Sequence, residues 1–95
     1  HVTTKKQWAD AQLKGHYDSD TLDIEGFIHC STEPQVAGVL ERYYQNQKAL
    51  LLLHIDETKL TALLKYDLAP SVNEEFPHIY GPLNLEAVVN TSDIN

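Results

Sequence analysis

The chain has 95 residues, one cysteine and a formal net charge of −7, with 7 lysines and arginines against 14 aspartates and glutamates. Nucleic acids and polyanionic membrane surfaces bind clusters of lysine and arginine, and only Lys5 and Lys6 form such a pair, so we expect neither partner. No apolar run approaches the ~20 residues of a membrane helix. The length favours a single domain. The lone cysteine cannot form an internal disulfide, which favours a reducing cytoplasm.

The first quarter of the chain predicts a strand, a capped helix and an acidic loop. Residues 1–3 have the character of the end of a first strand. Thr4 and Gln7 have the spacing of a capping box, which predicts a helix that ends at Gly15. Residues 16–25 are polar and acidic. We interpret them as a solvated loop with a helical turn, because they lack the oxygen ligand and glycine that a calcium loop needs at its fifth and sixth positions.

The stretch Gly26-Phe27-Ile28-His29-Cys30-Ser31-Thr32 predicts a short strand that runs directly into a helix N-terminus. Side chains alternate along a strand, so His29 and Ser31 share one face and Ile28 and Cys30 share the other. The second face is apolar and is predicted to be core. We therefore expect a ligand to meet the first face, and we interpret Cys30 as a buried thiol because its neighbour His29 points the opposite way.

The remaining elements are predicted from periodicity and turn residues. They are a helix over 32–46, a strand over 49–56, a helical turn over 57–60, strands over 61–67, 76–81 and 86–90, and a frayed tail over 91–95. Apolar residues of the helix recur at helical spacing and are predicted to face the core. Strand 49–56 is apolar on both faces, which predicts a central strand, whereas Pro77 favours an edge position or a strand start for strand 76–81.

Three predicted strands each carry a histidine and then a hydroxyl residue two positions later. The pairs are His1 with Thr3, His29 with Ser31, and His78 with Tyr80. Spacing of two places both polar groups of a pair on one face. If the strands are neighbours, six polar groups line one concave surface, which suits sugar hydroxyls, carboxamides and phosphate oxygens. The alternative is that each histidine is satisfied by a local partner.

Metal and phosphate-loop chemistry have little support in the sequence. There is no paired ligand spacing such as His-x-x-x-His and no glycine-rich phosphate loop, so no metal is expected. His54 is interpreted as a core or edge histidine.

Two stretches resemble the signatures of the small bacterial domain-of-unknown-function family 952. They are the stretch from Gly26 to Thr32 and Phe76-Pro77-His78-Ile79-Tyr80-Gly81-Pro82-Leu83, and the start, His1-Val2-Thr3-Thr4 with Trp8, also fits. The resemblance implies a single α+β domain over residues 1–90, outside which the frayed tail 91–95 lies. It also implies two short mixed or antiparallel sheets around a cleft, two main helices and a fold similar to that of ADP-ribosyltransferases.

From this fold similarity and the three histidine–hydroxyl pairs we expect a domain that binds NAD or ADP-ribose in a histidine-lined cleft, with transfer of an ADP-ribosyl group as the associated reaction. We also expect a monomer. Among the polar groups of the three pairs, His29 and His78 are the catalytic candidates. The ligand-binding candidates are His1, Thr3, Ser31 and Tyr80.

The RNA 2′-phosphotransferases are a branch of that superfamily with a similar His-x-Thr and a similar His-x-Ser that enters a helix. Their phosphate-holding arginines have no counterpart, because Arg42 is the single arginine of this chain. For the catalytic glutamate of many ADP-ribosyltransferases, Glu86 is the nearest candidate. The sequence therefore leaves open an alternative, a non-catalytic module that binds a protein or another metabolite.

Overall fold

The structure is a computed structural model that describes residues 1–94. Its helices and strands are β1 (Val2–Thr4), α1 (Lys5–Lys14), β2 (His16–Tyr17), α2 (Asp20–Glu25), β3 (Ile28–His29), α3 (Val36–Tyr43), β4 (Leu50–Ile55), β5 (Leu63–Ala69), β6 (Glu74–Tyr80), β7 (Leu83–Asn84) and β8 (Val88–Asp93). Short 3-10 turns, η1 (Glu33–Gln35), η2 (Glu57–Lys59) and η3 (Leu85–Ala87), precede α3, β5 and β8.

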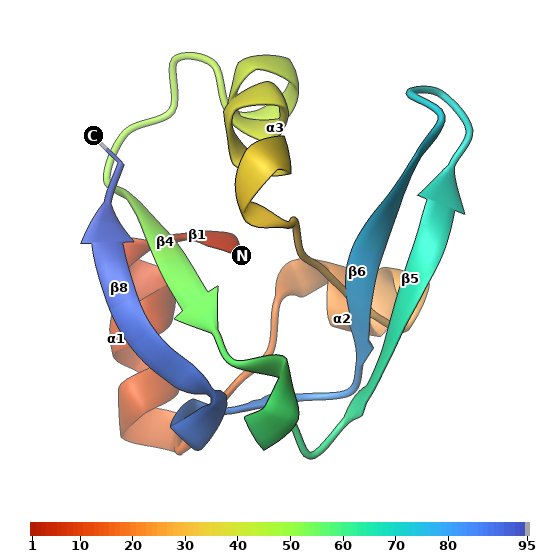
Figure 1. Cartoon of the computed structure of the whole chain (residues 1–95). Coiled ribbons are helices and arrows are strands. Elements are labelled where there is room, and N and C mark those ends of the chain that lie inside the picture. The colour runs from red at the N-terminus through yellow and green to blue at the C-terminus, as the bar shows by residue number, and fades with distance from the viewer. Residues whose placement is uncertain (95) are drawn as a thin grey trace.

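The strands form three small antiparallel sheets, with the orders β1-β4-β8, β2-β7 and β3-β6-β5. The two larger sheets splay apart, with α3 between their upper ends and α1 behind the β4–β8 pair (Figure 1). The predicted α+β class is confirmed. The prediction of two sheets, mixed or antiparallel, was incomplete: β2-β7 is a third sheet, its strands have only two residues each, and all the pairs are antiparallel.

The first helix begins and ends where the sequence predicts. The Thr4 hydroxyl accepts a hydrogen bond from the backbone N–H of Gln7 at 3.1 Å, so it caps α1. Gly15 has a φ of 97°, a conformation that costs glycine little, and its N–H donates to the carbonyl of Ala11 at 2.8 Å. Ala11 is buried, so α1 is fixed at both caps and along its inner face.

Strand β4 is central, as its two apolar faces predict. It pairs with β1 on one side and β8 on the other. Leu51 and Leu53 belong to the hydrophobic core on one face, and Leu50 is buried on the other. Burial on both faces is what makes a continuous run of leucines stable in this position.

The prediction that the apolar face of the second long helix packs into the core was wrong. Thr32 caps the turn η1 with the predicted capping box, but none of the residues of α3 is buried and Tyr43 is 60% exposed. The helix lies between the upper ends of the two larger sheets and does not lie flat on the face of either (Figure 1). Val39 and Tyr43 therefore border a cavity.

Pro77 lies inside β6, the central strand of its sheet, so the prediction of an edge position or a strand start was wrong. Its carbonyl accepts a hydrogen bond from the Cys30 N–H at 2.9 Å, which shows that its backbone faces β3. Proline has no N–H to return that bond. Pro77 therefore stands where the β3–β6 ladder ends, and strand β3 is correspondingly short.

The C-terminal strand and the acidic loop also differ from prediction. Strand β8 continues to Asp93 because it pairs with β4, with Thr91 opposite Leu53, so residues 91–93 are not frayed. Asn95, the last residue of the predicted tail 91–95, lies outside the described residues. The acidic loop contains α2 and the two-residue strand β2, whose Tyr17 is only 2% exposed.

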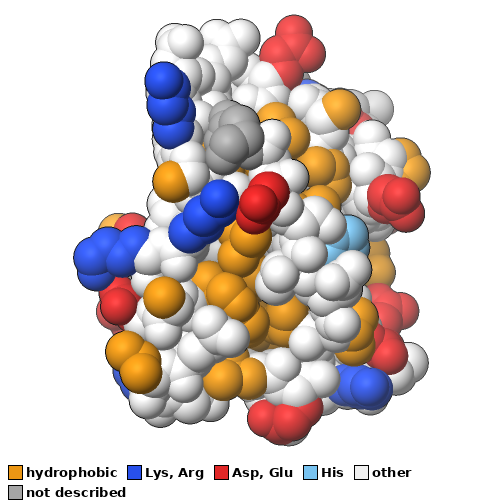
Figure 2. Space-filling view, turned by 90° about the vertical axis from the view of Figure 1, so that its left-hand side faces the viewer, with side chains coloured by type: hydrophobic (Ala, Val, Ile, Leu, Met, Phe, Trp, Pro, Cys, Tyr) orange, Lys and Arg blue, Asp and Glu red, His pale blue; other side chains and the backbone are white. Residues whose placement is uncertain are grey.

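Figure 2 looks onto the side of the molecule that carries β8 and α1. Most of the lysine and arginine side chains on this face lie in its left half and one lies at the lower right, while a patch of hydrophobic side chains lies near the centre. Three of the lysines, Lys5, Lys6 and Lys14, belong to α1. Within residues 1–94, no helix is long and apolar enough to cross a membrane.

Candidate functional site

The register of β3 against β6 brings two of the predicted histidines together. His29 lies opposite His78, and their ring centroids are 5.0 Å apart. Ile28 and Ile79, the next pair along, point to the core, so the predicted alternation of polar and apolar faces is confirmed. The ring of Phe27 stacks on His78 at 4.2 Å and 19°. This stacking leaves His78 only 9% exposed.

Each of these imidazoles is held by one carboxylate. The Nε2 atom of His29 hydrogen-bonds Glu25, and the Nδ1 atom of His78 lies 2.8 Å from Oδ2 of Asp67. The Tyr80 hydroxyl donates to the same oxygen of Asp67. Within the described residues, no hydrogen bond engages the second ring nitrogen of either histidine. Both imidazoles are therefore oriented, and each has one nitrogen available to a ligand.

The shared carboxylate changes the acidity of the groups around it. Hydrogen bonds from Tyr80 and then from His78 hold the pKa of Asp67 below its usual value. The same bond raises the pKa of the Tyr80 phenol, because it favours the form that carries the proton. These hydrogen bonds therefore favour a charged Asp67 carboxylate beside a neutral Tyr80 phenol.

His1 reaches the site from the other large sheet. Its Nδ1–H donates to the backbone carbonyl of His29 at 2.5 Å, and its Nε2 lies 2.8 Å from the Tyr17 hydroxyl. Tyr17 donates to Thr3 at 2.9 Å, and Thr3 donates to Gln7 at 3.0 Å. Burial raises the pKa of Tyr17 to about 12, so its proton is retained at neutral pH. This chain of hydrogen bonds positions His1.

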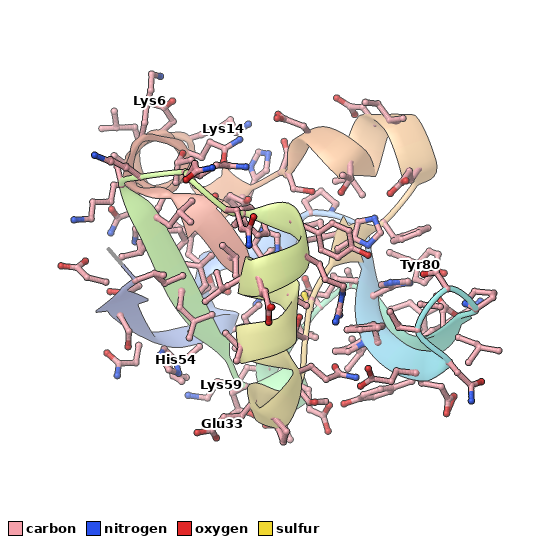
Figure 3. All side chains as sticks on the ribbon, turned by 90° about the horizontal axis from the view of Figure 1, so that it is seen from above. Lys6, Lys14, Glu33, His54, Lys59 and Tyr80 are labelled. Carbon is pink, nitrogen blue, oxygen red and sulfur yellow. The ribbon has the colours of Figure 1, made fainter. Side chains whose placement is uncertain are left out.

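These histidines open onto a cavity of about 530 Å³. Four of the six predicted site residues line it, namely His1, His29, Ser31 and His78. Thr3 and Tyr80 do not: Thr3 is buried in the hydrogen-bond chain, and Tyr80 acts on the site through Asp67. Tyr80 lies over the β5–β6 sheet, far from His54, which lies beside β4 and β8 (Figure 3).

Further aromatic side chains and a carboxylate also line the cavity. Tyr43, Tyr44 and Phe76 contribute rings, and Asp20 contributes the negative charge. Among the described residues that line the cavity there is no lysine or arginine. The cavity therefore suits a neutral or cationic group with hydroxyls better than a bare phosphate.

Sequence reasoning missed three of the groups that build this site. Asp67 and Glu25 orient the histidines, and Tyr17 positions His1. Asp67 reaches His78 only through the pairing of β5 with β6, which no local pattern predicts. Glu25 and His29 are separated by a turn at Gly26. That glycine was the one feature of the sequence that could have indicated the contact between them.

Cys30 is a buried core thiol, as interpreted. It is 9% exposed, and burial raises its pKa to about 11. A thiol with that pKa holds its proton at neutral pH and is a poor nucleophile. His54 contacts Ser92 at 2.8 Å, a partner on the neighbouring strand, and it does not line this cavity.

Two other expectations concern metals and the catalytic glutamate. Within residues 1–94, no three side chains of His, Cys, Asp or Glu converge as metal ligands would. Glu86 is exposed in η3 and does not line the cavity. Glu25 does not line the cavity, but it hydrogen-bonds His29, which does.

Comparisons with known proteins place the chain in a family. Two crystal structures of protein CC0527 from Caulobacter crescentus, one of them a double mutant, are similar to it with TM-scores of 0.90. The identities are 25% for the mutant and 26% for the other, over 100% of this chain and 83% of CC0527. No curated protein matches the chain. Residues 2–91 match the family described as "protein of unknown function (DUF952)". The chain therefore belongs to the DUF952 family.

Proposed function

We propose that this domain binds a nucleotide-like small molecule of the NAD or ADP-ribose class in the histidine-lined cavity, and that its fold is related to that of the ADP-ribosyltransferases. One observation carries the proposal. The imidazoles of His1, His29 and His78 come from two different sheets and open onto one cavity of about 530 Å³. A pocket of that size is within the range of small-molecule sites.

The lining suits the sugar and ring portions of such a ligand. Imidazole nitrogens and the Ser31 hydroxyl can donate to or accept from ribose hydroxyls. Tyr43 and Phe76 offer rings on which a base or nicotinamide can stack. Among the described residues of the lining, Asp20 supplies the only formal charge apart from the histidines, so the phosphates belong at the mouth of the cavity, toward solvent.

A transfer reaction would use the arrangement of His78. In that reaction the bond between the ribose anomeric carbon and the nicotinamide nitrogen breaks, and the electron pair leaves with nicotinamide. An acceptor hydroxyl forms the new bond to the anomeric carbon, and the Nε2 atom of His78 takes its proton. Asp67 fixes the Nδ1–H of His78, which keeps Nε2 as the basic nitrogen.

A second candidate function is binding without turnover, by a module that keeps the fold and takes a metabolite or a protein. The observation in its favour is that the described part of the chain puts no glutamate in the cavity lining. Oxocarbenium-like transition states are stabilised by nearby negative groups, and Asp20 is the one lining carboxylate. A transferase and a non-catalytic metabolite-binding module would both bind the nucleotide, so binding by itself does not distinguish these two functions.

An amide-shift titration with NAD, ADP-ribose and nicotinamide tests the proposal. We expect shifts concentrated in residues 27–32 and 76–81, and weaker shifts in a His29→Ala, His78→Ala double variant. His16→Ala is the matched control, because His16 is a histidine that lines no part of the cavity. Absence of shifts in both segments at millimolar ligand would refute nucleotide binding. Release of nicotinamide from NAD then separates transfer from binding alone.

A further inference from the structure

Strand β5 forms one edge of its sheet and is long for so small a domain. It has seven residues, Leu63–Ala69, and pairs with β6 over its whole length without a bulge. In Figure 1 it is the outermost strand on the right, with no element beyond it. Its outer edge is therefore free to pair with another strand.

The hydrogen-bond pattern shows which backbone groups face outward. The Pro77 carbonyl accepts from Cys30, so the backbone groups of Pro77 and Ile79 face β3 and those of His78 face β5. Lys65 lies opposite His78, and so its backbone faces β6. The N–H and C=O groups of three residues must then face away from the sheet: Leu64, Tyr66 and Leu68. Among residues 1–94, no backbone hydrogen bond from beyond β6 reaches these three.

The edge has few of the usual protections against pairing, because its two charges, Lys65 and Asp67, are of opposite sign. Natural edge strands are blunted by proline, bulges, several charges or a covering element. Strand β5 has no proline and no bulge. It exposes Leu63 at 58%, Tyr66 at 49% and Leu68 at 57%. An apolar, regular edge of this kind is expected to be covered in the functional protein.

We propose that a second copy of this chain covers the edge, by antiparallel pairing of β5 with β5 about a two-fold axis at Tyr66. In this register Tyr66 faces Tyr66, and Leu64 faces Leu68 of the second copy. These are the residues whose backbone groups point outward, so each such pair can exchange two hydrogen bonds. The two sheets then join into one sheet of six strands.

Charge selects this register over its neighbours. With Tyr66 at the axis, Lys65 of each copy stands directly opposite Asp67 of the other, twice by symmetry. A shift of two residues one way puts Lys65 opposite Lys65, and the same shift the other way puts Asp67 opposite Asp67. Opposite charges across a pair stabilise a sheet and like charges destabilise it. The sequence of β5 is therefore self-complementary in one register.

The interface would also reach the site. Asp67 holds both His78 and Tyr80, and Lys65 now lies with its Nζ 5.1 Å from the centre of the Tyr80 ring. Pairing adds Lys65 of the second copy to the surroundings of Asp67. The dimer differs from the monomer expected from the sequence. Because the pairing uses the edge of β5, it stands whether or not the cavity binds a nucleotide.

A charge-swap experiment tests the register. Lys65→Asp leaves two acidic residues opposite two acidic residues in a homodimer, and Asp67→Lys leaves basic opposite basic. Each variant alone should dimerise at least about tenfold more weakly than the parent in sedimentation equilibrium. An equimolar mixture should restore the dimer, because every pair is then of opposite charge. Lys48→Asp is the matched control, with the same charge change outside β5, and should dimerise like the parent.

A second series tests the backbone edge and does not alter Asp67. Leu68→Pro removes an N–H that faces outward and leaves the ladder to β6 intact, whereas Leu68→Ala keeps that N–H. We expect loss of the dimer only in the proline variant. Amides of Leu64, Tyr66 and Leu68 should be protected from hydrogen exchange in the parent. A parent that is monomeric at millimolar concentration overturns the proposal, and so does a dimer that survives both Leu68→Pro and the charge changes.

Discussion

The Nδ1 atom of His78 lies 2.8 Å from the Oδ2 atom of Asp67, a residue 11 positions earlier on the neighbouring strand. The carboxylate accepts the imidazole N–H, which fixes the tautomer of His78 and leaves Nε2 as its basic nitrogen. Tyr80 donates to the same oxygen. One carboxylate thus orients both polar side chains of the His78–Tyr80 pair.

The first prediction concerns the phenol of Tyr80. Asp67→Asn replaces the charged acceptor with a neutral amide, so the pKa of Tyr80, now raised by Asp67, should fall toward the ordinary value of 10.0. The ring-carbon NMR shift of Tyr80 over an alkaline titration measures this change. Asp56→Asn is the control, because Asp56 is bonded to Thr58 and to no tyrosine. An unchanged Tyr80 titration in Asp67→Asn would mean that the hydrogen bond does not form in solution.

The second prediction concerns acid stability. The pKa of Asp67 is lowered in the folded chain from 3.8, through the bonds to Tyr80 and His78. The native state therefore gains stability from this group above pH 3.8, and loses it as the pH falls through the lower native value. The unfolding temperature of Asp67→Asn should depend less steeply on pH in this acid range than that of the parent. Equal slopes for the two proteins would contradict it.

The third prediction tests the buried hydroxyl that positions His1. Tyr17→Phe removes the hydroxyl group that contacts His1 and donates to Thr3, and leaves these partners unsatisfied. We expect a loss of roughly 1–3 kcal/mol in the free energy of unfolding, measured with urea. Tyr43→Phe, a change at an exposed position, should cost nothing measurable.

The third prediction extends to alkaline pH. The native pKa of Tyr17 is raised from 10.0 to about 12, because burial disfavours the phenolate. Stability due to this difference is complete below the ordinary value and is lost as the pH rises through the native value. Tyr17→Phe should lack that part of the alkaline decline. The two proteins would decline in parallel if Tyr17 were accessible to solvent.

The fourth prediction concerns Cys30. Its thiol is buried and its pKa is raised to about 11, so it should resist alkylation at about pH 8 in the native protein and react after unfolding. A Ser71→Cys change in a Cys30→Ala background supplies an exposed thiol as the control. Alkylation of native Cys30 at the rate of that control would revive a nucleophilic role.

The fifth prediction compares two leucines. Leu53 is 2% exposed and belongs to the core cluster, so Leu53→Ala should cost about 2–5 kcal/mol. Leu40 lies on α3, which has no buried residue, and Leu40→Ala should cost about 1 kcal/mol or less. Urea unfolding measures both. A loss at Leu40 as large as that at Leu53 would mean that α3 packs more tightly in solution.

Local signals in the sequence determined much of the secondary structure. Thr4 and Gly15 delimit α1, and Thr32 caps the turn before α3, because a cap depends on residues within one helical turn. The alternation of Ile28 and His29 fixed which face of β3 is polar, since the period of a strand is two. These features depend on neighbours in the chain, and so the sequence contains them directly.

The tertiary structure alone decided which of these features meet. Asp67 became the partner of His78 through the register of β5 on β6, and His1 reached His29 from another sheet. Strand pairing joins residues far apart in the chain, and no local pattern specifies which two strands pair. The apolar face of α3 was misplaced for the same reason. A sequence pattern shows that a helix has an apolar face, but only the arrangement of the sheets decides what that face contacts.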